Sequence, residues 1–230
     1  MEGYCLKNTE KFQPSPMAGR RRAQQLPGAR WVRQRRDKKL PRSFACGTDT
    51  VKPGLSLLII TRRPRSLEVS GFALGLLRAG PFTLTCALGQ AGIHPHKKEG
   101  DKATPAGRFA LLHGFFRTDR SVRQVLSLPM RPIRPQDGWC DDPQNPNYNR
   151  LVRLPFRASH EKLWRADSLY DLVIVLDYNV SPRRKNRGSA IFLHCAREGF
   201  APTEGCIALR AGDLRKLLPC LAKKAVLVIK

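Results

Sequence analysis

Short hydrophobic or alternating segments recur along the chain from residue 55 onward and predict a series of β-strands. Clusters of glycine, proline, asparagine and aspartate separate these segments, as turns separate neighbouring strands. The segments span residues 55–60, 67–72, 82–88, 108–113, 169–178, 190–194, 206–209 and 225–229. The pattern therefore favours a mainly β domain.

One segment, residues 212–222, has the periodicity of a helix. Its leucines recur at spacings of three and four, which places them on one helical face: Leu214, Leu217, Leu218 and Leu221. Pro219 lies inside this segment, lacks an N–H group and would end the helix before its last turn. We therefore expect a minor helical contribution to the β domain.

Two regions show neither the strand nor the helix periodicity of hydrophobic residues. Residues 129–150 are rich in proline, and we expect a long loop there, of the kind that is functional or disordered in compact domains. Residues 1–51 are rich in Arg, Lys, Gln and Pro, a composition that buries too little apolar surface to fold alone. We expect a disordered basic extension over residues 1–51 and one folded domain over residues 52–230.

The formal net charge of +24 indicates an anionic partner. Lipid headgroups, acidic wall polymers and nucleic acid all carry the required charge. Trp31 and Phe44 are not interleaved with the basic residues in the way that single-stranded nucleic acid requires. We expect the extension to contact a membrane surface or wall polymer, and we do not expect nucleic acid as the partner.

The seven cysteines exclude some classes of protein. An odd number leaves at least one thiol unpaired in a monomer, and the lack of a C-x-x-C pair argues against thioredoxin-like chemistry and zinc ribbons. His94 and His96 have no third ligand at a convincing spacing, so neither a metal nor a cofactor is expected. Neither a run of 18 apolar residues nor an apolar segment behind the basic N-terminus is present, so we expect no spanning helix and no standard secretory signal.

Cys206 and His194 are the candidate catalytic pair. His194 ends a hydrophobic segment, and Cys206 begins another after Gly205, so a return loop could bring thiol and imidazole together. A thiol needs a neighbouring base to react at neutral pH, and N–H groups near Gly205 could hold an oxyanion. Thr203 could orient a group of the site or cap the turn. The alternative is a structural cysteine that fills a strand and a histidine hydrogen-bonded to a neighbouring strand.

Four further residues are candidates for substrate binding. Asp141 and Asp142 follow Trp139, and two carboxylates beside an aromatic ring could bind an ammonium group. Alternatively, the pair forms an Asx turn before a proline. His160 could line the cleft or assist proton transfer, or it could be a surface histidine at the edge of a loop.

Two motifs, and their order along the chain, resemble those of the L,D-transpeptidase catalytic domain (YkuD-like) family, in its proteobacterial branch. One is the histidine, a variable loop and then Thr-x-Gly-Cys, and the other is a Thr-Pro-x-Gly-x-Phe element preceded by an entry loop. The matching residues are His194, Pro202-Thr203-Glu204-Gly205-Cys206-Ile207, Lys98-Glu99-Gly100-Asp101 and Ala103-Thr104-Pro105-Ala106-Gly107-Arg108-Phe109, with Gly138-Trp139-Cys140-Asp141-Asp142-Pro143 and Tyr148-Asn149 between them. The resemblance covers residues 52–230.

This resemblance implies a β-sandwich or mixed-sheet catalytic domain that crosslinks peptidoglycan in cell wall biogenesis. Cys206 would attack the diaminopimelate carbonyl of a tetrapeptide stem to form a thioester, and a second stem would resolve it in a 3→3 crosslink. His194 would act as acid and base, with Gly205 and Thr203 supporting the site. A monomer in the periplasm or cell envelope is expected. An L,D-carboxypeptidase that uses water as acceptor, and an inactive basic wall-binding or nucleic-acid-binding protein, remain alternatives.

Two positions depart from the family pattern. Ala208 stands where the family has an arginine, so Arg210 or Arg197 would have to hold the carboxylate of the donor peptide. Cys195 stands where the family has a glycine. Its proximity in sequence to the site suggests the hypothesis of an inhibitory disulfide with Cys206.

Overall fold

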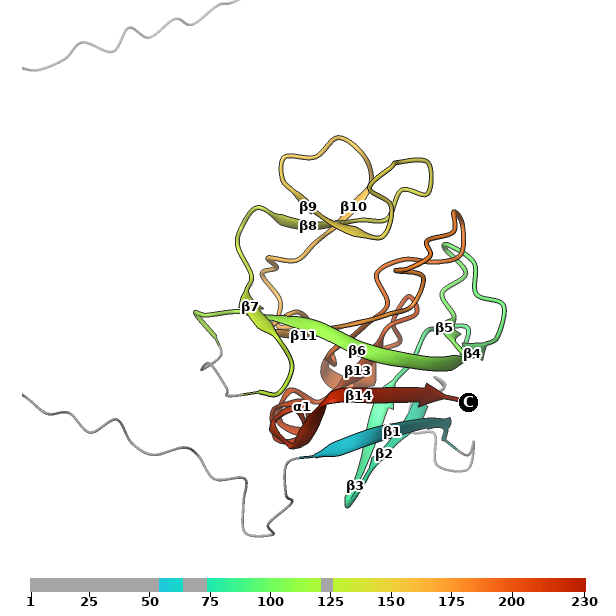
Figure 1. Cartoon of the computed structure of the whole chain (residues 1–230), viewed down its shortest axis with the longest axis vertical. Coiled ribbons are helices and arrows are strands. Elements are labelled where there is room, and N and C mark those ends of the chain that lie inside the picture. The colour runs from blue at the N-terminus through green and yellow to red at the C-terminus, as the bar shows by residue number, and fades with distance from the viewer. Residues whose placement is uncertain (1–53, 64–73, 121–125) are drawn as a thin grey trace, which may run out of the picture. The chain divides into compact units, whose positions relative to one another are not determined.

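The computed structural model describes residues 54–63, 74–120 and 126–230 (Figure 1). The expected basic extension over residues 1–51 and the predicted strand at residues 67–72 lie outside these ranges. The other predicted strands are all present, which confirms a mainly β fold with little helix.

Nine strands form one mixed sheet in the order β11-β12-β13-β3-β2-β1-β14-β6-β7. Strand β11 also pairs with β6, so the sheet closes on itself and β7 extends from β6 outside the ring. Closure removes most of the exposed strand edges. The strands are β1 (Leu55–Arg62), β2 (Leu74–Ala79), β3 (Phe82–Ala87), β6 (Gly107–Phe116), β7 (Met130–Pro132), β11 (Leu172–Leu176), β12 (Phe192–Cys195), β13 (Ile207–Leu209) and β14 (Leu221–Ile229).

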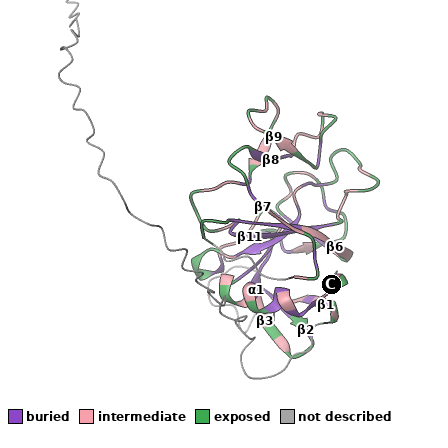
Figure 2. Cartoon of the chain, turned by 60° about the vertical axis from the view of Figure 1, so that its left-hand side comes forward, coloured by how far each residue is buried: buried purple, intermediate pink, exposed green. Residues whose placement is uncertain are grey.

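Alternation along the strands builds the main core inside this ring. In β1, Leu58 and Ile60 are fully buried, whereas Ile59 between them is only partly buried and Leu57 before them is exposed. In Figure 2 the buried residues are concentrated on the strands of the ring, whereas the loops are mostly exposed or intermediate. Each buried aliphatic side chain contributes about 1.5–3 kcal/mol by leaving water. In β1 the hydrophobic pattern therefore indicates which face points inward, whereas β11, β12 and β13 are buried at every position.

A smaller three-stranded sheet lies above the ring in Figure 1. It consists of β10 (His160–Lys162), β8 (Asp137–Cys140) and β9 (Arg150–Arg153), and a further pair joins β4 (Ile93–His94) to β5 (Thr104–Pro105). The prediction of one long loop over residues 129–150 is therefore wrong, because β7, β8 and the start of β9 fall there. Strands of three or four residues between prolines are too short to show alternation.

The predicted helix is present but short. Helix α1 (Ala211–Leu217) continues into the 3-10 helix η3 (Leu218–Cys220), and β14 begins at once. The leucine face is buried as expected. Pro219 lies in η3, where the chain leaves the α-helix, and it supplies no N–H for another turn.

Candidate functional site

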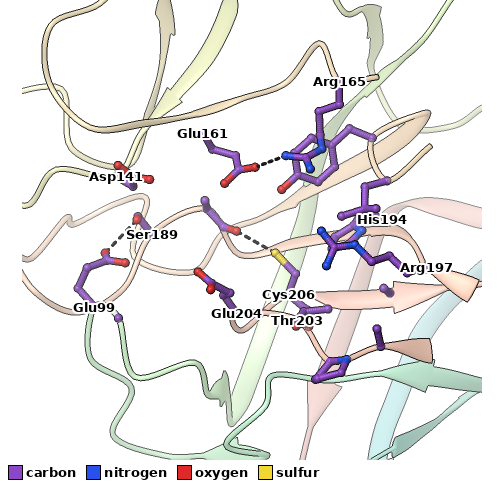
Figure 3. A pocket seen from close by; sticks show the side chains of 17 residues that line it. Glu99, Asp141, Glu161, Arg165, Ser189, His194, Arg197, Thr203, Glu204 and Cys206 are labelled. Atoms are coloured by element: carbon purple, nitrogen blue, oxygen red, sulfur yellow. Dashed lines mark hydrogen bonds and ion pairs between the residues drawn. The ribbon is translucent and has the colours of Figure 1, made fainter. Parts of the chain in front are cut away.

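Strands β12 and β13 place Cys206 and His194 on the same face of the sheet. The two strands are parallel, with Leu193 opposite Ile207 and His194 opposite Ala208. Because side chains alternate along a strand, His194 shares its face with Ala208 and with Cys206, two residues before Ala208. Leu193 and Ile207 point to the main core on the other face. The return loop between the strands therefore brings the thiol and the imidazole to one side, as Figure 3 shows.

Both side chains line a pocket with a volume of about 320 Å³. The pocket is acidic, although the protein as a whole is strongly basic. Its walls carry four carboxylates and two guanidinium groups: Glu99, Asp141, Glu161, Glu204, Arg165 and Arg197 (Figure 3). A pocket with an excess of carboxylates favours a ligand that carries a positive group.

The Cys206 thiol is held by two backbone groups. The sulfur donates to the Ala190 carbonyl at 3.0 Å and accepts from the Phe192 N–H at 3.4 Å. Burial raises the pKa of the thiol to about 12, the Phe192 N–H opposes this rise, and the Glu161 carboxylate adds to it. The thiol at this position is therefore neutral at neutral pH.

His194 is buried and has one ring nitrogen occupied. The Cys195 carbonyl lies 2.8 Å from Nδ1, and a carbonyl can only accept, so Nδ1 carries the proton and Nε2 is the acceptor. The ring of Tyr170 packs edge-on against the imidazole at a centroid distance of 5.3 Å. Burial lowers the pKa of His194 to about 4. At neutral pH the pair is thus a thiol and a neutral imidazole that can act as a base.

Thr203 stabilises the turn that precedes Cys206. Its hydroxyl donates to the Cys206 carbonyl at 2.7 Å and accepts from the Gly205 N–H at 3.1 Å. Its backbone N–H donates to the Leu88 carbonyl at 2.9 Å, which ties the turn to the end of β3. Thr203 therefore caps the turn and, in doing so, fixes the backbone on either side of Cys206.

Position 205 requires glycine for two reasons, its backbone angle and the lack of space for a Cβ atom. Its φ of +131° suits glycine, and a Cβ there would lie 2.7 Å from the Ala103 carbonyl oxygen. We expect Gly205→Ala to lower the free energy of unfolding by roughly 2–4 kcal/mol, measured by denaturant unfolding, because a rigid backbone must move. Gly199→Ala is the matched control, since Gly199 also has a positive φ but has open space around it. Equal losses for both variants would mean that the contact with Ala103 is unimportant.

The two aspartates that follow Trp139 have different surroundings. Asp141 lines the pocket, and its Oδ1 is buried without a hydrogen-bond partner. Asp142 accepts the Gln144 N–H at 2.9 Å in an Asx turn. The Asx-turn interpretation therefore fits Asp142, and Asp141 is the member of the pair that lines the pocket.

The remaining predicted residues lie outside the pocket lining. Trp139 packs its ring on Phe192 at 5.2 Å and donates its indole N–H to Asn149, so it supports the strand beneath the site. The His160 ring is hydrogen-bonded to the Ala158 carbonyl. The Arg210 guanidinium stacks over another ring, that of Phe200, at 5.1 Å. Of the two arginines considered for the donor carboxylate, Arg197 is the one that lines the pocket.

Sequence reasoning missed several pocket residues. Arg165 pairs with Glu161 at 3.0 Å and with Asp167 at 2.7 Å, and burial raises the pKa of Glu161 despite the arginine. Glu99 accepts from the Ser189 hydroxyl at 2.9 Å and from Tyr148. Glu99 had a signal in the sequence, because it lies in the entry loop of the family motif, and so did Glu204, which lies in the motif that contains Cys206.

Cys195 faces away from the pocket. It follows His194 on β12 and is fully buried in the core on the opposite face, where burial raises the pKa of its thiol to about 11. A disulfide requires both Cβ atoms to approach within about 4.5 Å on converging vectors. The hypothesis of a direct disulfide with Cys206 is therefore incompatible with this strand.

Two kinds of feature are absent from the described residues. No group of three His, Cys, Asp or Glu side chains in the described ranges has a metal-binding arrangement. Among the same residues, no helix has the length and apolar character that crossing a membrane requires.

Comparison with known families identifies the domain. No curated protein and no solved structure gives a significant match to the chain. A family model, that of the L,D-transpeptidase catalytic domain (YkuD), matches residues 75–229 and therefore includes the pocket and both candidate catalytic residues. Because this match spans more than half of the sequence, the chain belongs to the L,D-transpeptidase catalytic domain family.

Proposed function

We propose that this protein is a cysteine-dependent L,D-transpeptidase that acts on peptidoglycan stem peptides, with Cys206 as nucleophile and His194 as base. The observation that carries this proposal is the placement of thiol and imidazole on one face, at one pocket, in a chain of this family. The substrate would be a tetrapeptide stem whose diaminopimelate carbonyl reacts, as the family resemblance implies.

The neutral pair suits a concerted attack. As the Cys206 sulfur bonds to the substrate carbonyl carbon, Nε2 of His194 takes the thiol proton, and the carbonyl π electrons move to oxygen. The tetrahedral intermediate then expels the terminal D-Ala amine, which receives the proton from His194, and a thioester remains. The amine of a second stem attacks the thioester, gives its proton to His194, and the thiolate is protonated as it leaves.

The backbone near the nucleophile would stabilise the oxyanion. The Gly205 N–H is already taken by the Thr203 hydroxyl. We therefore assign the Cys206 N–H as the oxyanion donor, with the Gly205–Thr203 contact holding that peptide in place. This assignment gives Gly205 and Thr203 supporting roles.

The acidic wall would bind the ammonium group of diaminopimelate. Asp141 is the strongest candidate, because its buried Oδ1 has no partner in the protein and a ligand ammonium would supply one. Arg197 is exposed at the pocket rim and would hold the carboxylate of the donor. Arg165 is committed to Glu161 and Asp167.

We expect Asp141→Asn to raise KM for a tetrapeptide stem about tenfold or more and to change kcat little, because a charged hydrogen bond of about 1.5–3 kcal/mol is lost in the ground state and transition state alike. Steady-state release of D-Ala measures both constants. Asp142→Asn is the matched control, since its carboxylate caps a turn beside the pocket. A control variant with the same rise in KM would argue against a specific ammonium site.

Intact-protein mass spectrometry after mixing with a tetrapeptide stem tests the proposed function. We expect an acyl adduct with loss of D-Ala, mapped by peptide digestion to Cys206. Adding a stem that carries a free side-chain amine should discharge the adduct into a crosslinked dimer. Discharge by water alone would identify an L,D-carboxypeptidase, and a folded protein without any adduct would indicate an inactive binding protein.

The net charge of +24 favours work at an anionic surface. We propose that the basic extension contacts wall polymer or anionic lipid in the cell envelope, where stem peptides are found. This placement would raise the local concentration of substrate around a catalytic domain that acts as a monomer.

A further inference from the structure

Lys97 is a buried cation that sequence reasoning did not single out. It lies in the loop between β4 and β5, and its side chain is 2% exposed. Its ammonium group lies 2.7 Å from Asp101 Oδ1 and donates to the Lys98 carbonyl at 3.4 Å. Burying a charge is costly even when it is paired, so a lysine in this position calls for a physical explanation.

Two glycines make room for this side chain. A Cβ on Gly188 would lie 2.8 Å from Lys97 Cε, and a Cβ on Gly205 would lie 3.1 Å from Lys97 Nζ. Gly188 precedes the segment whose Ala190 carbonyl accepts from the Cys206 thiol, and Gly205 directly precedes the nucleophile. The ammonium group therefore lies next to Gly205, in the turn that directly precedes Cys206.

Asp101 holds the lysine in this position. Its carboxylate accepts from Lys97 Nζ, from the Lys98 N–H at 2.6 Å and from the Ala103 N–H at 2.9 Å. Partial burial acts to raise the pKa of Asp101, but these three donors outweigh it and the pKa lies below its ordinary value. The ion pair is thus part of a rigid loop. The ammonium group cannot move away from the turn without breaking its ion pair with Asp101.

The charges around the Cys206 thiol are otherwise unfavourable for a thiolate. Glu161 on β10 and Glu204 in the turn raise the pKa of Cys206, whereas Lys97 lowers it. His194 on β12 is neutral at rest because burial lowers its pKa. Among the described residues, Lys97 is the buried cation that lowers the pKa of this thiol and so offsets the effect of the two carboxylates.

We propose that Lys97 is a positioning residue of the reaction: its fixed ammonium group stabilises the negative charge that develops on Cys206 and holds the turn that presents the thiol. The inference rests on the proposed role of Cys206. It assigns a functional reason to Gly188 and Gly205, since a Cβ at either position would crowd the lysine side chain.

The alkylation rate of Cys206 tests this role without any substrate. Iodoacetamide reacts with the thiolate, so in the pH range where the rate rises tenfold per pH unit the variant with the larger acid dissociation constant reacts faster, although its thiolate is a somewhat weaker nucleophile. We expect Lys97→Met to react roughly tenfold more slowly at Cys206, followed by peptide-resolved mass spectrometry. Lys98→Met is the matched control, because it removes an exposed positive charge from the next residue and should stay within about twofold of wild type.

A double variant separates charge from loop stability. Lys97→Met leaves the Asp101 carboxylate without its ion-pair partner, whereas Lys97→Met with Asp101→Asn removes both charges and should not recover the alkylation rate. The double variant should not regain full stability, because an amide oxygen can accept only one of the two backbone N–H groups that Asp101 binds. A double variant with the wild-type rate would overturn the electrostatic role, and so would a Lys97→Met rate equal to that of Lys98→Met. Failure of the proposed function is distinguishable, since wild-type Cys206 would then form no acyl adduct with a stem peptide even where alkylation depends on Lys97.

Discussion

Replacing Cys206 by serine is expected to lower kcat/KM for stem peptides by roughly a thousandfold or more and to abolish the acyl adduct. The serine hydroxyl is a much weaker acid than the thiol, and His194 as a neutral imidazole with a lowered pKa is too weak a base to compensate. The fold should change little, because the side chains are similar in size and Cys206 is only half-buried. Release of D-Ala and intact-protein mass spectrometry provide the two measurements.

Cys195→Ser is the informative control for this experiment. Cys195 lies on the neighbouring strand, but its side chain is buried in the core of the opposite face. A hydroxyl there would lower stability by about 1–3 kcal/mol, as a buried polar group without a designed partner does, and leave the acyl adduct in place. If Cys206→Ser kept the activity or Cys195→Ser removed the adduct from a folded protein, Cys206 would not be the nucleophile.

The sequence singled out Cys206 and His194 as a candidate catalytic pair because both residues belong to local patterns. His194 ends a hydrophobic segment, and Cys206 follows a glycine at the start of another. The structure places Leu193 in the main core and His194 at the pocket, as alternation along a strand requires. What the pattern does not contain is the parallel register of β12 and β13, which decides that the thiol shares the imidazole's face.

The rest of the pocket comes from long-range pairing that local patterns do not encode. Strand β10 pairs with β8, and this brings Glu161 to the pocket that Asp141 also lines. Asp141 and Asp142 are indistinguishable in sequence, and only the fold shows that one lines the pocket while the other caps a turn. Lys97 was equally hidden, because a lysine in a basic chain is expected at the surface.

The balance of charge over the whole chain differs from the balance in the pocket. Over the whole chain the excess of +24 attracts polyanions, whereas the pocket wall has more carboxylates than guanidinium groups. Long-range attraction to an anionic surface and local selection of a cationic group are compatible, since screening limits the former to about 8–10 Å at physiological salt but affects buried charges much less. The proposed contact of the chain with an acidic polymer is therefore compatible with the proposed binding of an ammonium group in the pocket.

His194→Gln is expected to lower kcat by about a hundredfold to ten-thousandfold, the usual contribution of a general base, and to change how stability depends on pH. Burial lowers the pKa of His194 from 6.5 to about 4 in the folded state. Between these values the unfolded chain binds a proton that the folded protein does not, so the free energy of unfolding falls as the pH falls, by roughly 3 kcal/mol at most. The glutamine variant should lack this loss, which denaturant unfolding at pH 7 and pH 4 measures.

His160→Gln provides the comparison, because the His160 ring lies outside the pocket lining. It should keep both the activity and the wild-type loss of stability on acidification. His113, whose pKa is also lowered by burial, is present in both variants, so the difference between them isolates His194. The kinetic signature follows from the same pKa: kcat/KM of the wild type should fall as the pH drops through about 4, where the base becomes protonated. A wild-type acid limb near pH 6.5, or one that survives in His194→Gln, would assign the base to another residue.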